Sequence, residues 1–370
     1  MEHFEKLLSE EHEQLIFCSN KESGLKAIIA IHNTSLGPAL GGTRMLNYSS
    51  TDEAIEDALR LAKGMTYKAA IAGLNFGGGS AIIIGDANAE KGELLFRTFG
   101  KYIEGLAGRF ITAEDVGTTV RDMEYVRMET KYVTGISKSI GGSGDPAPVT
   151  AYGVYIGMKA CAKEKWGNDS LRGRKIAVQG AGHVSRFLVE YLYNEGAELF
   201  ISDINESRAR KTLEFVKAEI VDAEEIYDLD VDIFSPNALG AVLNDNTVER
   251  LNADIIAGAA NNQLADEEKH GKILMEKGIL YAPDYVINSG GLINVANELE
   301  GYRQDRAMKH AESIYEIVSK VIKLSQKEGI PTNIASQRLA ESRLEKIGKI
   351  SNIYSGKSEF TGRLGELTRK

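Results

Sequence analysis

The stretch Val178-Gln179-Gly180-Ala181-Gly182-His183-Val184-Ser185 decides the fold of this chain. It follows a short apolar run at 175–178 that predicts a buried strand, and it opens an apolar-striped segment over 184–195 that predicts a helix. A second apolar run, at 199–202, ends on Asp203. This order of strand, glycine turn, helix, strand and acid is typical of a dinucleotide-binding βαβ unit.

The glycines and the acid each have a physical task in such a unit, although two glycines alone would also fit a plain turn. Gly180 allows the tight turn, and Gly182 lets the backbone approach a pyrophosphate that the N–H groups at the helix start attract. A carboxylate at Asp203 would bind the ribose hydroxyls and repel a 2′-phosphate, so the sequence favours NAD over NADP. The expected cofactor contacts are Gly180, Ala181, Gly182, His183, Val184, Ser185 and Asp203, of which Ser185 replaces the motif's third glycine.

The composition of the 370-residue chain is that of a globular protein with two or more domains. Its net charge of −9 argues against nonspecific nucleic-acid binding and against anionic membranes. The chain has no apolar run long enough for a transmembrane helix and no signal-peptide pattern at its start. Two cysteines, Cys18 and Cys161, indicate a reducing, cytoplasmic location. The six histidines form no closely spaced pair with a carboxylate, so we expect no metal.

The pattern after Asp203 alternates between short apolar runs and helical stripes, which predicts a mostly parallel, doubly wound sheet. Strands are expected at 231–235, 253–257 and 285–288, and a helix over 307–326. The fold class is therefore α/β, with this Rossmann domain preceded by an N-terminal α/β domain. A segment rich in Gly, Ser and Pro at 133–150 predicts the hinge.

The first half of the chain carries the other candidate chemistry. Residues 4–17 predict an amphipathic helix, and 36–45 is glycine-rich and loop-like. Ser50, as N-cap, begins a further helix that we expect to stop at Gly64. Beyond it come Lys68 in a largely apolar stretch, three consecutive glycines at 77–79, and a strand that ends on two acids at 114–115. Each of these alone is also compatible with a solvated side chain or a simple turn.

Together these stretches resemble the Glu/Leu/Phe/Val amino-acid dehydrogenase family, and most closely its leucine-oxidising branch. The resemblance runs through most of the chain with little shift in spacing. Members of this family oxidatively deaminate an L-amino acid to its 2-oxo acid and ammonia with NAD, reversibly. The stretches that carry it are GPALGGTRM (37–45), KGMTYKAA (63–70), GLNFGGG (73–79), RFITAEDVGTT (109–119), VTGISKSIGGSGDPAPVTAYGVYIGMKA (133–160), IIAGAANNQL (255–264) and YAPDYVINSGGLINVANEL (281–299).

The resemblance implies a role for particular residues. Lys68 would bind the substrate carboxylate, and Asp115 would shuttle protons at the reacting carbon. Positions around the nicotinamide and the amino-acid head would be Thr150, Asn261, Asn262 and Asn288. The side-chain pocket would be lined by Leu40, Gly41, Ala113, Gly291 and Asn294. Leu40 and Ala113 fit a branched aliphatic side chain, whereas Gly291 would leave room and Asn294 would make the wall more polar.

One departure from the family bears on the reaction itself. The family has a lysine after the three glycines, which acts as the general base that activates water, and this chain has Ser80. A hydroxyl cannot take up a proton at neutral pH without a base of its own. Three readings stay open. Lys68 or Asp115 compensates and deamination proceeds; the chain is an impaired or repurposed homologue acting on an imine or carbonyl substrate; or it binds NAD and an amino acid without turnover.

The resemblance also implies the domain layout and the assembly. A substrate and oligomerisation domain would span 1–145 with a C-terminal return at 327–370, a Rossmann domain would span 146–326, and the substrate cleft would lie between them. We expect a cytoplasmic homo-oligomer, an octamer by family resemblance, with small-molecule amino-acid and 2-oxo-acid partners.

Overall fold

The computed structural model describes residues 2–238 and 240–352, and the chain forms two compact units. Among these residues, unit 1 comprises 2–145, 294–304 and 340–352, and unit 2 comprises 146–238, 240–293 and 305–339. Residues 353–370, the last part of the predicted C-terminal return, lie outside the described residues. Each unit is a mixed α/β structure built on its own sheet, which confirms the predicted fold class.

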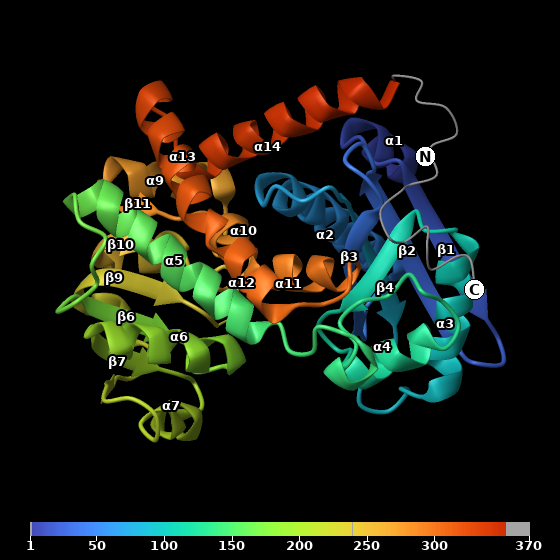
Figure 1. Cartoon of the computed structure of the whole chain (residues 1–370), viewed down its shortest axis with the longest axis horizontal. Helices are drawn as coiled ribbons and strands as arrows, with labels where there is room; N and C mark the ends of the chain where they lie inside the picture. The colour runs from blue at the N-terminus through green and yellow to red at the C-terminus, as the bar shows by residue number, and fades with distance from the viewer. Residues whose placement is uncertain (1, 239, 353–370) are drawn as a thin grey trace. The chain divides into compact units, whose positions relative to one another are not determined.

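Unit 2 is built on a parallel six-stranded sheet in the order β11-β10-β9-β6-β7-β8 (Figure 1). Chain order reverses next to β6, and the arrangement is the strand order of a dinucleotide-binding fold. The carboxyl ends of β6 and β7, at this reversal, are where such a sheet places its ligand. The strands are β6 (Lys175–Gln179), β7 (Glu198–Ser202), β8 (Glu219–Ile220), β9 (Asp230–Pro236), β10 (Asn252–Ile256) and β11 (Leu280–Tyr281).

The helices of unit 2 connect these strands and cover the sheet. Helix α5 packs against α6 and α13, and a separate apolar cluster includes Phe234 and Leu274. Helix α11 (Gly290–Glu298) carries the chain from unit 2 into unit 1. The remaining helices are α5 (Ala147–Trp166), α6 (His183–Glu195), α7 (Glu206–Thr212), η2 (Glu225–Asp228), α8 (Asp245–Arg250), α9 (Glu267–Glu276), α10 (Asp284–Ile287), α12 (Gln304–Ala311), α13 (Ser313–Glu328) and α14 (Thr332–Gly348), the last of which continues into unit 1.

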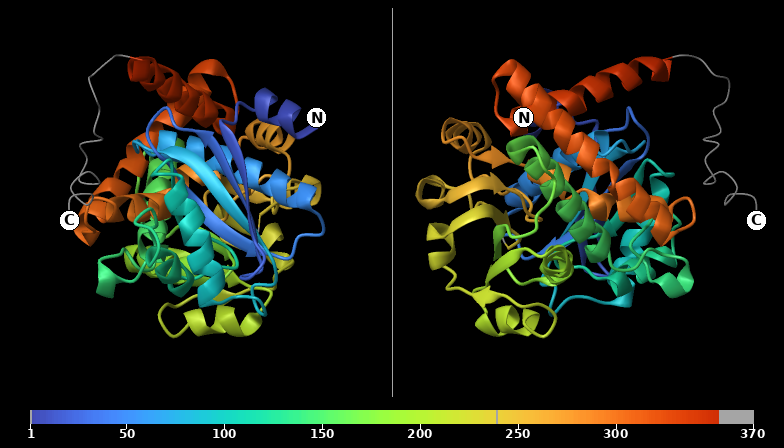
Figure 2. Two further views of the ribbon diagram at one scale, coloured as in Figure 1. Left: turned by 90° about the vertical axis from the view of Figure 1, so that its right-hand side faces the viewer. Right: turned by 60° about the vertical axis from the view of Figure 1, so that its left-hand side comes forward.

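Unit 1 contains a five-stranded sheet in the order β1-β2-β4-β3-β5, seen in the left-hand view of Figure 2. Strand β2 pairs antiparallel with both β1 and β4, and β3 pairs parallel with both β4 and β5. The strands are β1 (Gln14–Asn20), β2 (Leu25–Asn33), β3 (Ala39–Leu46), β4 (Gly77–Ile84) and β5 (Phe110–Glu114). The helices are α1 (Glu2–Ser9), α2 (Thr51–Ile71), α3 (Glu93–Gly105) and α4 (Val120–Arg127), with short 3₁₀ turns η1 (Lys138–Ile140) and η3 (Lys349–Asn352).

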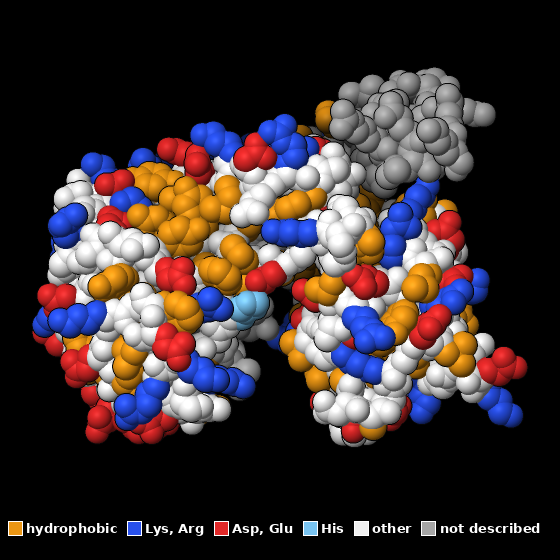
Figure 3. Space-filling model, turned by 60° about the horizontal axis from the view of Figure 1, so that its bottom comes forward, with side chains coloured by type: hydrophobic (Ala, Val, Ile, Leu, Met, Phe, Trp, Pro, Cys, Tyr) orange, Lys and Arg blue, Asp and Glu red, His pale blue; other side chains and the backbone are white. Residues whose placement is uncertain are grey.

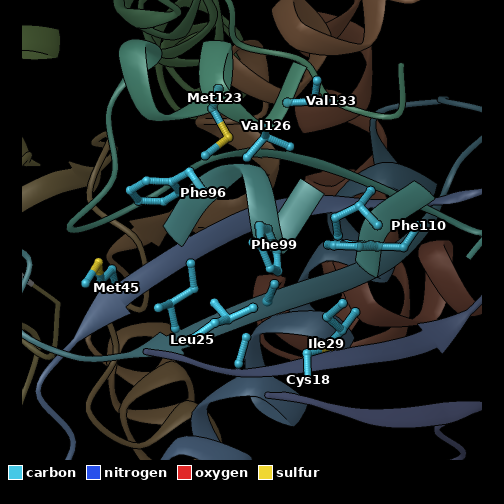
Figure 4. Close-up of a cluster of buried hydrophobic side chains, with 14 of the residues drawn as sticks. Cys18, Leu25, Ile29, Met45, Phe96, Phe99, Phe110, Met123, Val126 and Val133 are labelled. Carbon is cyan, nitrogen blue, oxygen red and sulfur yellow. The ribbon is translucent and has the colours of Figure 1, made fainter. Parts of the chain in front are cut away.

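The two faces of the unit 1 sheet have different cores. On one face α3 and α4 bring Phe96, Phe99, Met123 and Val126 against Phe110 of β5 (Figure 4). On the other face α2 packs its alanine-rich stripe on β2 and β4, with Ile28, Ala30 and Ile82 from the sheet. Small side chains let α2 approach the sheet closely. Because side chains alternate along a strand, Ser80 lies on the same face as Ile82, which is the α2 face.

Two predicted elements of the first 50 residues are wrong. The helix predicted over 4–17 ends at Ser9, and 14–20 forms strand β1, because antiparallel pairing with β2 outweighs the helical stripe. The stretch 36–45, predicted as a loop, contains strand β3 instead. Its glycines have low strand propensity, but β3 is hydrogen-bonded to neighbours on both sides.

Three further expectations need correction. Ser50 is the N-cap of α2, as predicted. The helix does not stop at Gly64 but continues to Ile71, because Thr66, Ala69 and Ala70 of its last turns are buried in the protein. The strand expected at 285–288 is replaced by the short helix α10. The helix expected over 307–326 is two helices, α12 and α13, that meet at Glu312. An apolar run as short as 285–288 fits either a strand or a helix, which periodicity alone does not separate.

Three further observations concern the surface, the helices and the titratable side chains. Acidic and basic side chains are interspersed over the face drawn in Figure 3. Within residues 2–238 and 240–352, no helix is both long and apolar enough to cross a membrane. Over the same ranges, His, Cys, Asp and Glu form no group of three that could hold a metal ion.

Candidate active site

The glycine turn lies at the carboxyl ends of β6 and β7 in unit 2. The Gly180 amide donates to the Ser202 carbonyl at 2.7 Å, which ties the turn to β7. Gly180 has φ +94°, and a Cβ there would lie 2.9 Å from Ala238, so both conformation and space require glycine. By contrast, a Cβ on Gly182, the N-cap of α6, would meet no atom within 4 Å. The backbone at the start of α6 is therefore open to a ligand.

Asp203 closes the other side of this turn. Its two carboxylate oxygens accept the amides of Ala181 and Asn205, both at 2.8 Å. The carboxylate is thereby fixed next to the glycine turn, and each oxygen keeps a lone pair for another donor. His183 and Val184 form the first helical positions, and Ser185 is buried, with no hydrogen-bond partner for its hydroxyl within the described ranges.

A second group of predicted residues lies on other elements of unit 2. The Asn288 amide group donates to the Ala259 carbonyl at 3.1 Å and to Asn261 Oδ1 at 2.7 Å. Asn262 adopts φ +51°, and its carbonyl accepts the Ala241 amide at 2.7 Å. Asn288 is 3% exposed, and its Oδ1 has no partner in the part of the chain that the structure describes. A buried, unpaired acceptor points to a missing donor.

Thr150 and Gly291 also meet in unit 2. The Thr150 hydroxyl donates to the Pro146 carbonyl at 3.0 Å, in the first turn of α5. A Cβ on Gly291 would lie 2.9 Å from that hydroxyl oxygen, so a side chain there would press on Thr150.

These residues fit NAD. The open helix start at Gly182 suits a pyrophosphate, the fixed Asp203 carboxylate suits ribose hydroxyls, and the unpaired Asn288 Oδ1 suits the N–H of a carboxamide. Ile204, directly after Asp203, brings no cation for a 2′-phosphate.

The candidate substrate residues of unit 1 lie on its parallel strands and on helix α2, with Leu40 and Gly41 near the start of β3 and Ala113 near the end of β5. Leu40 and Gly41 are on β3, and Ala113 is on β5; all three are buried. Lys68 lies on the last turn of α2, half-buried, and it is there because α2 continues beyond Gly64. A Cβ on Gly78 would lie 2.1 Å from the Thr66 amide nitrogen, so the glycine run allows α2 and β4 to approach closely.

Ser80 is the fourth residue of β4 and is 1% exposed. Its hydroxyl donates one long hydrogen bond, of 3.5 Å, to the Gly42 carbonyl of β3. Within the described ranges, this is the contact that the hydroxyl makes, and no carboxylate or imidazole reaches it. Ser80 therefore lacks an adjacent group that could activate it as a base.

Asp115 follows β5, and its carboxylate is held by two groups. Oδ1 accepts the Val116 amide at 2.7 Å, and Oδ2 lies 3.4 Å from Nη2 of Arg44 on β3. The sequence prediction missed Arg44. The signal was present, since a charged side chain inside a glycine-rich buried stretch needs a partner.

Asn294 is fully buried on α11, and its Oδ1 accepts the Tyr302 hydroxyl at 2.8 Å. Its Nδ2 has no partner over 2–238 and 240–352. The structure thus brings together Asp203 with the glycine turn, Asn288 with Asn261, and Gly291 with Thr150.

Comparisons with known proteins cover both units. The family model described as "Glu/Leu/Phe/Val dehydrogenase, dimerisation domain" matches residues 12–132, and that described as "Glutamate/Leucine/Phenylalanine/Valine dehydrogenase" matches 141–206 and 200–346. The chain is 56% identical to the leucine dehydrogenase of Thermoactinomyces intermedius over 354 residues, which cover 96% of each protein. It is 47% identical to an L-tryptophan dehydrogenase of Nostoc punctiforme, with 92% of this chain and 96% of the relative covered.

A solved structure agrees with these matches. The crystal structure of L-tryptophan dehydrogenase from Nostoc punctiforme superposes with a TM-score of 0.82 at 45% identity, covering 93% of this chain and 99% of that one.

Proposed function

The chain belongs to the Glu/Leu/Phe/Val dehydrogenase family, and from this premise we propose that it oxidatively deaminates a branched-chain or other apolar L-amino acid with NAD. The overall reaction converts the zwitterionic amino acid, NAD⁺ and water into the 2-oxo acid, ammonium, NADH and a proton. The observation that carries the proposal is the 56% identity to a leucine dehydrogenase over 96% of its length, which includes both units.

Each unit would contribute one half of the chemistry. In unit 2, the glycine turn would hold the pyrophosphate and Asp203 would hold the ribose hydroxyls of the adenosine. The nicotinamide would be oriented by Thr150, Asn261, Asn262 and Asn288. NAD supplies a hydride acceptor at the nicotinamide ring. In unit 1, Lys68 would hold the substrate carboxylate by a charge-assisted hydrogen bond, and Asp115 would accept the proton of the substrate ammonium group.

The test is NADH formation by the full chain with a panel of L-leucine, L-valine, L-isoleucine, L-phenylalanine and L-tryptophan, each with NAD and with NADP. We expect turnover with NAD and an apolar amino acid. Lys68→Ala serves as the matched control, because loss of a charged hydrogen bond should lower kcat/KM by about 10- to 100-fold. No turnover above this control with any of the five would contradict the proposal.

A second candidate function follows from Ser80 alone. Because no base among the described residues contacts this buried hydroxyl, water activation would be weakened, whereas hydride transfer needs only positioning. The chain would then act on an imine or carbonyl substrate without hydrolysis, or bind NAD and an amino acid without turnover. Tight binding of both ligands by calorimetry, with no NADH formed, would favour the non-catalytic binder. Reduction of a preformed imine without ammonia exchange would favour the repurposed enzyme.

We also infer a cytoplasmic homo-oligomer, an octamer. The description of the matching N-terminal model as a dimerisation domain supports association, and the two free, buried cysteines support a reducing compartment. Light scattering on the purified chain measures the assembly directly. A monomer at working concentrations would contradict this inference.

A further inference from the structure

Arg44 is a half-buried cation on β3 with two carboxylate neighbours on different elements. Its Nη1 lies 3.0 Å from Asp57 Oδ2 on α2, and its Nη2 lies 3.4 Å from Asp115 Oδ2 after β5. Its side chain is 17% exposed, and its Nε is buried without a hydrogen-bond partner in the described ranges. A charge held in this way is screened little by water or salt.

Asp57 fixes the position of this guanidinium. Its carboxylate also accepts the Tyr48 hydroxyl at 2.6 Å and Nη2 of Arg60 at 2.9 Å. Burial acts to raise the pKa of Asp57, but the hydrogen bonds from Tyr48 and Arg60 and the charge of Arg44 outweigh it, so the pKa is lowered. Asp57 therefore stays ionised and anchors one arm of Arg44, which leaves Nη2 beside Asp115.

Several charged or titratable groups lie on the elements around Asp115. The groups whose charges interact with it include Arg44, Tyr48 and Glu114, and Lys68 lies on the same helix as Asp57. Burial raises the pKa of Glu114, and the charges of Asp145 and Asp115 act in the same direction. Burial acts to lower the pKa of Arg44, but the Asp115 and Asp57 carboxylates outweigh it, so the pKa is raised.

Ser80 adds no charge to this face of the sheet. Its hydroxyl donates to the carbonyl of Gly42, and a Cβ on Gly42 would lie 2.7 Å from the Asp115 Cβ. Ser80, Gly42 and Asp115 are therefore close neighbours, and the position that could carry a cation carries a hydroxyl.

We propose that Arg44 is a positioning residue that aims the Asp115 carboxylate and places a positive charge beside it, in a site where Ser80 supplies none. Asp115 can accept a proton from the substrate ammonium group only as a carboxylate. Arg44 favours that form by its charge, and Asp57 holds Arg44 in place. The inference rests on the proposed function for the identity of the proton donor, but the ionisation of Asp115 can be measured without it.

The test compares Arg44→Met and Arg44→Lys with Arg60→Met as the matched control, since Arg60 contacts Asp57 but not Asp115. In Arg44→Met, the acid limb of the kcat/KM profile should move to higher pH by about one to three units, as expected on losing an adjacent opposite charge. Arg44→Lys keeps a positive charge, so the acid limb should stay close to its wild-type position, and Arg60→Met should leave the limb in place. An equal loss of kcat/KM at every pH in both Arg44 variants would overturn the proposal and would mean that Arg44 only stabilises the fold.

A second readout does not need turnover. The ¹³C carboxyl resonance of Asp115, assigned by its loss in Asp115→Asn, can be titrated in the full chain and in folded Arg44→Met. The resonance should titrate at higher pH in the variant, and identical titrations would overturn the proposal. If the wild-type chain turns over no amino acid while this titration shifts, then the proposed function fails and the inference about Arg44 stands.

Discussion

At the scale of single residues, the candidate site depends on Asp203 beside the glycine turn, on Arg44 beside Asp115, and on the substitution at Ser80. Asp203 bound to the Ala181 amide agrees with the sequence prediction of an acid beside the glycine turn. Arg44, in contrast, was not predicted. Its charge was visible in the sequence, but Asp57 and Asp115 are brought to it by a helix and a strand that sequence spacing does not relate.

Ser80→Lys is the most informative single substitution. If the missing base limits the reaction, then restoring a lysine should raise the deamination rate by about 10²–10⁴-fold. Steady-state rates of the wild type and the variant with the preferred amino acid measure this. The binding constant for NADH, measured by fluorescence in both, serves as the control and should agree. An unchanged rate would show that the site works without a base at this position.

Asp203 sets the expected preference for NAD. Asp203→Ala removes the carboxylate that would repel a 2′-phosphate and bind the ribose, so NADH binding should weaken by about 10-fold or more while NADPH binding improves. Fluorescence titration with the two nucleotides measures both. Glu206→Ala, three residues further on at the exposed start of α7, should change neither. A parallel loss for both nucleotides in Asp203→Ala would mean that the residue acts only on the fold of the turn.

At the scale of elements, the strands around the glycine turn in the second sheet could be predicted, whereas the strand expected at 285–288 and parts of the first sheet could not. The βαβ unit is local, so strand, turn, helix and acid all appear within about 30 residues. In unit 1, β3 is a strand because it pairs with β4 and β5, which lie far along the chain. Strand β1 forms by pairing with β2, although its own sequence has a helical apolar stripe. Glycine-rich β3 has no intrinsic strand preference that could reveal this.

Helix α2 provides a test of its unpredicted length. Gly64 lies exposed inside it, and a Cβ there would meet no atom within 4 Å. Gly64→Ala should therefore raise the free energy of unfolding by about 0.5–1 kcal/mol. Gly78→Ala is the opposite case, because its Cβ would lie 2.1 Å from the Thr66 amide nitrogen, and it should destabilise the protein. Denaturant unfolding measures both; a destabilising Gly64→Ala would mean that the helix does not run through this position.

At the scale of the whole molecule, a buried histidine pair predicts how stability depends on pH. The His12 and His32 rings lie 4.7 Å apart, and His32 contacts the Thr66 hydroxyl at 2.8 Å. Burial lowers the pKa of His32 to about 4, and the nearby His12 acts in the same direction. The unfolded chain takes up this proton near pH 6.5. Stability is therefore full above about pH 6.5 and is lost as the pH falls toward 4.

The expected loss from His32 alone is of the order of 3 kcal/mol across that window. Chemical unfolding at about pH 7.5 and about pH 4 measures it. His32→Gln, which can keep a hydrogen bond to Thr66, should be less stable at the higher pH but should lose less on acidification. If the wild type and the variant lose the same free energy between these values, then His32 is not the group that titrates.

In the proposed function each unit contributes residues to one reaction, and the products of that reaction distinguish the three readings of Ser80. The most direct measurement is the amount of ammonia released for each NADH formed when the full chain oxidises L-leucine or its preferred apolar amino acid. We predict equal amounts of the two, because oxidative deamination hydrolyses every imine that it forms. NADH without matching ammonia, or neither product with any apolar amino acid, would contradict the assignment of this chain as an NAD-dependent amino-acid dehydrogenase.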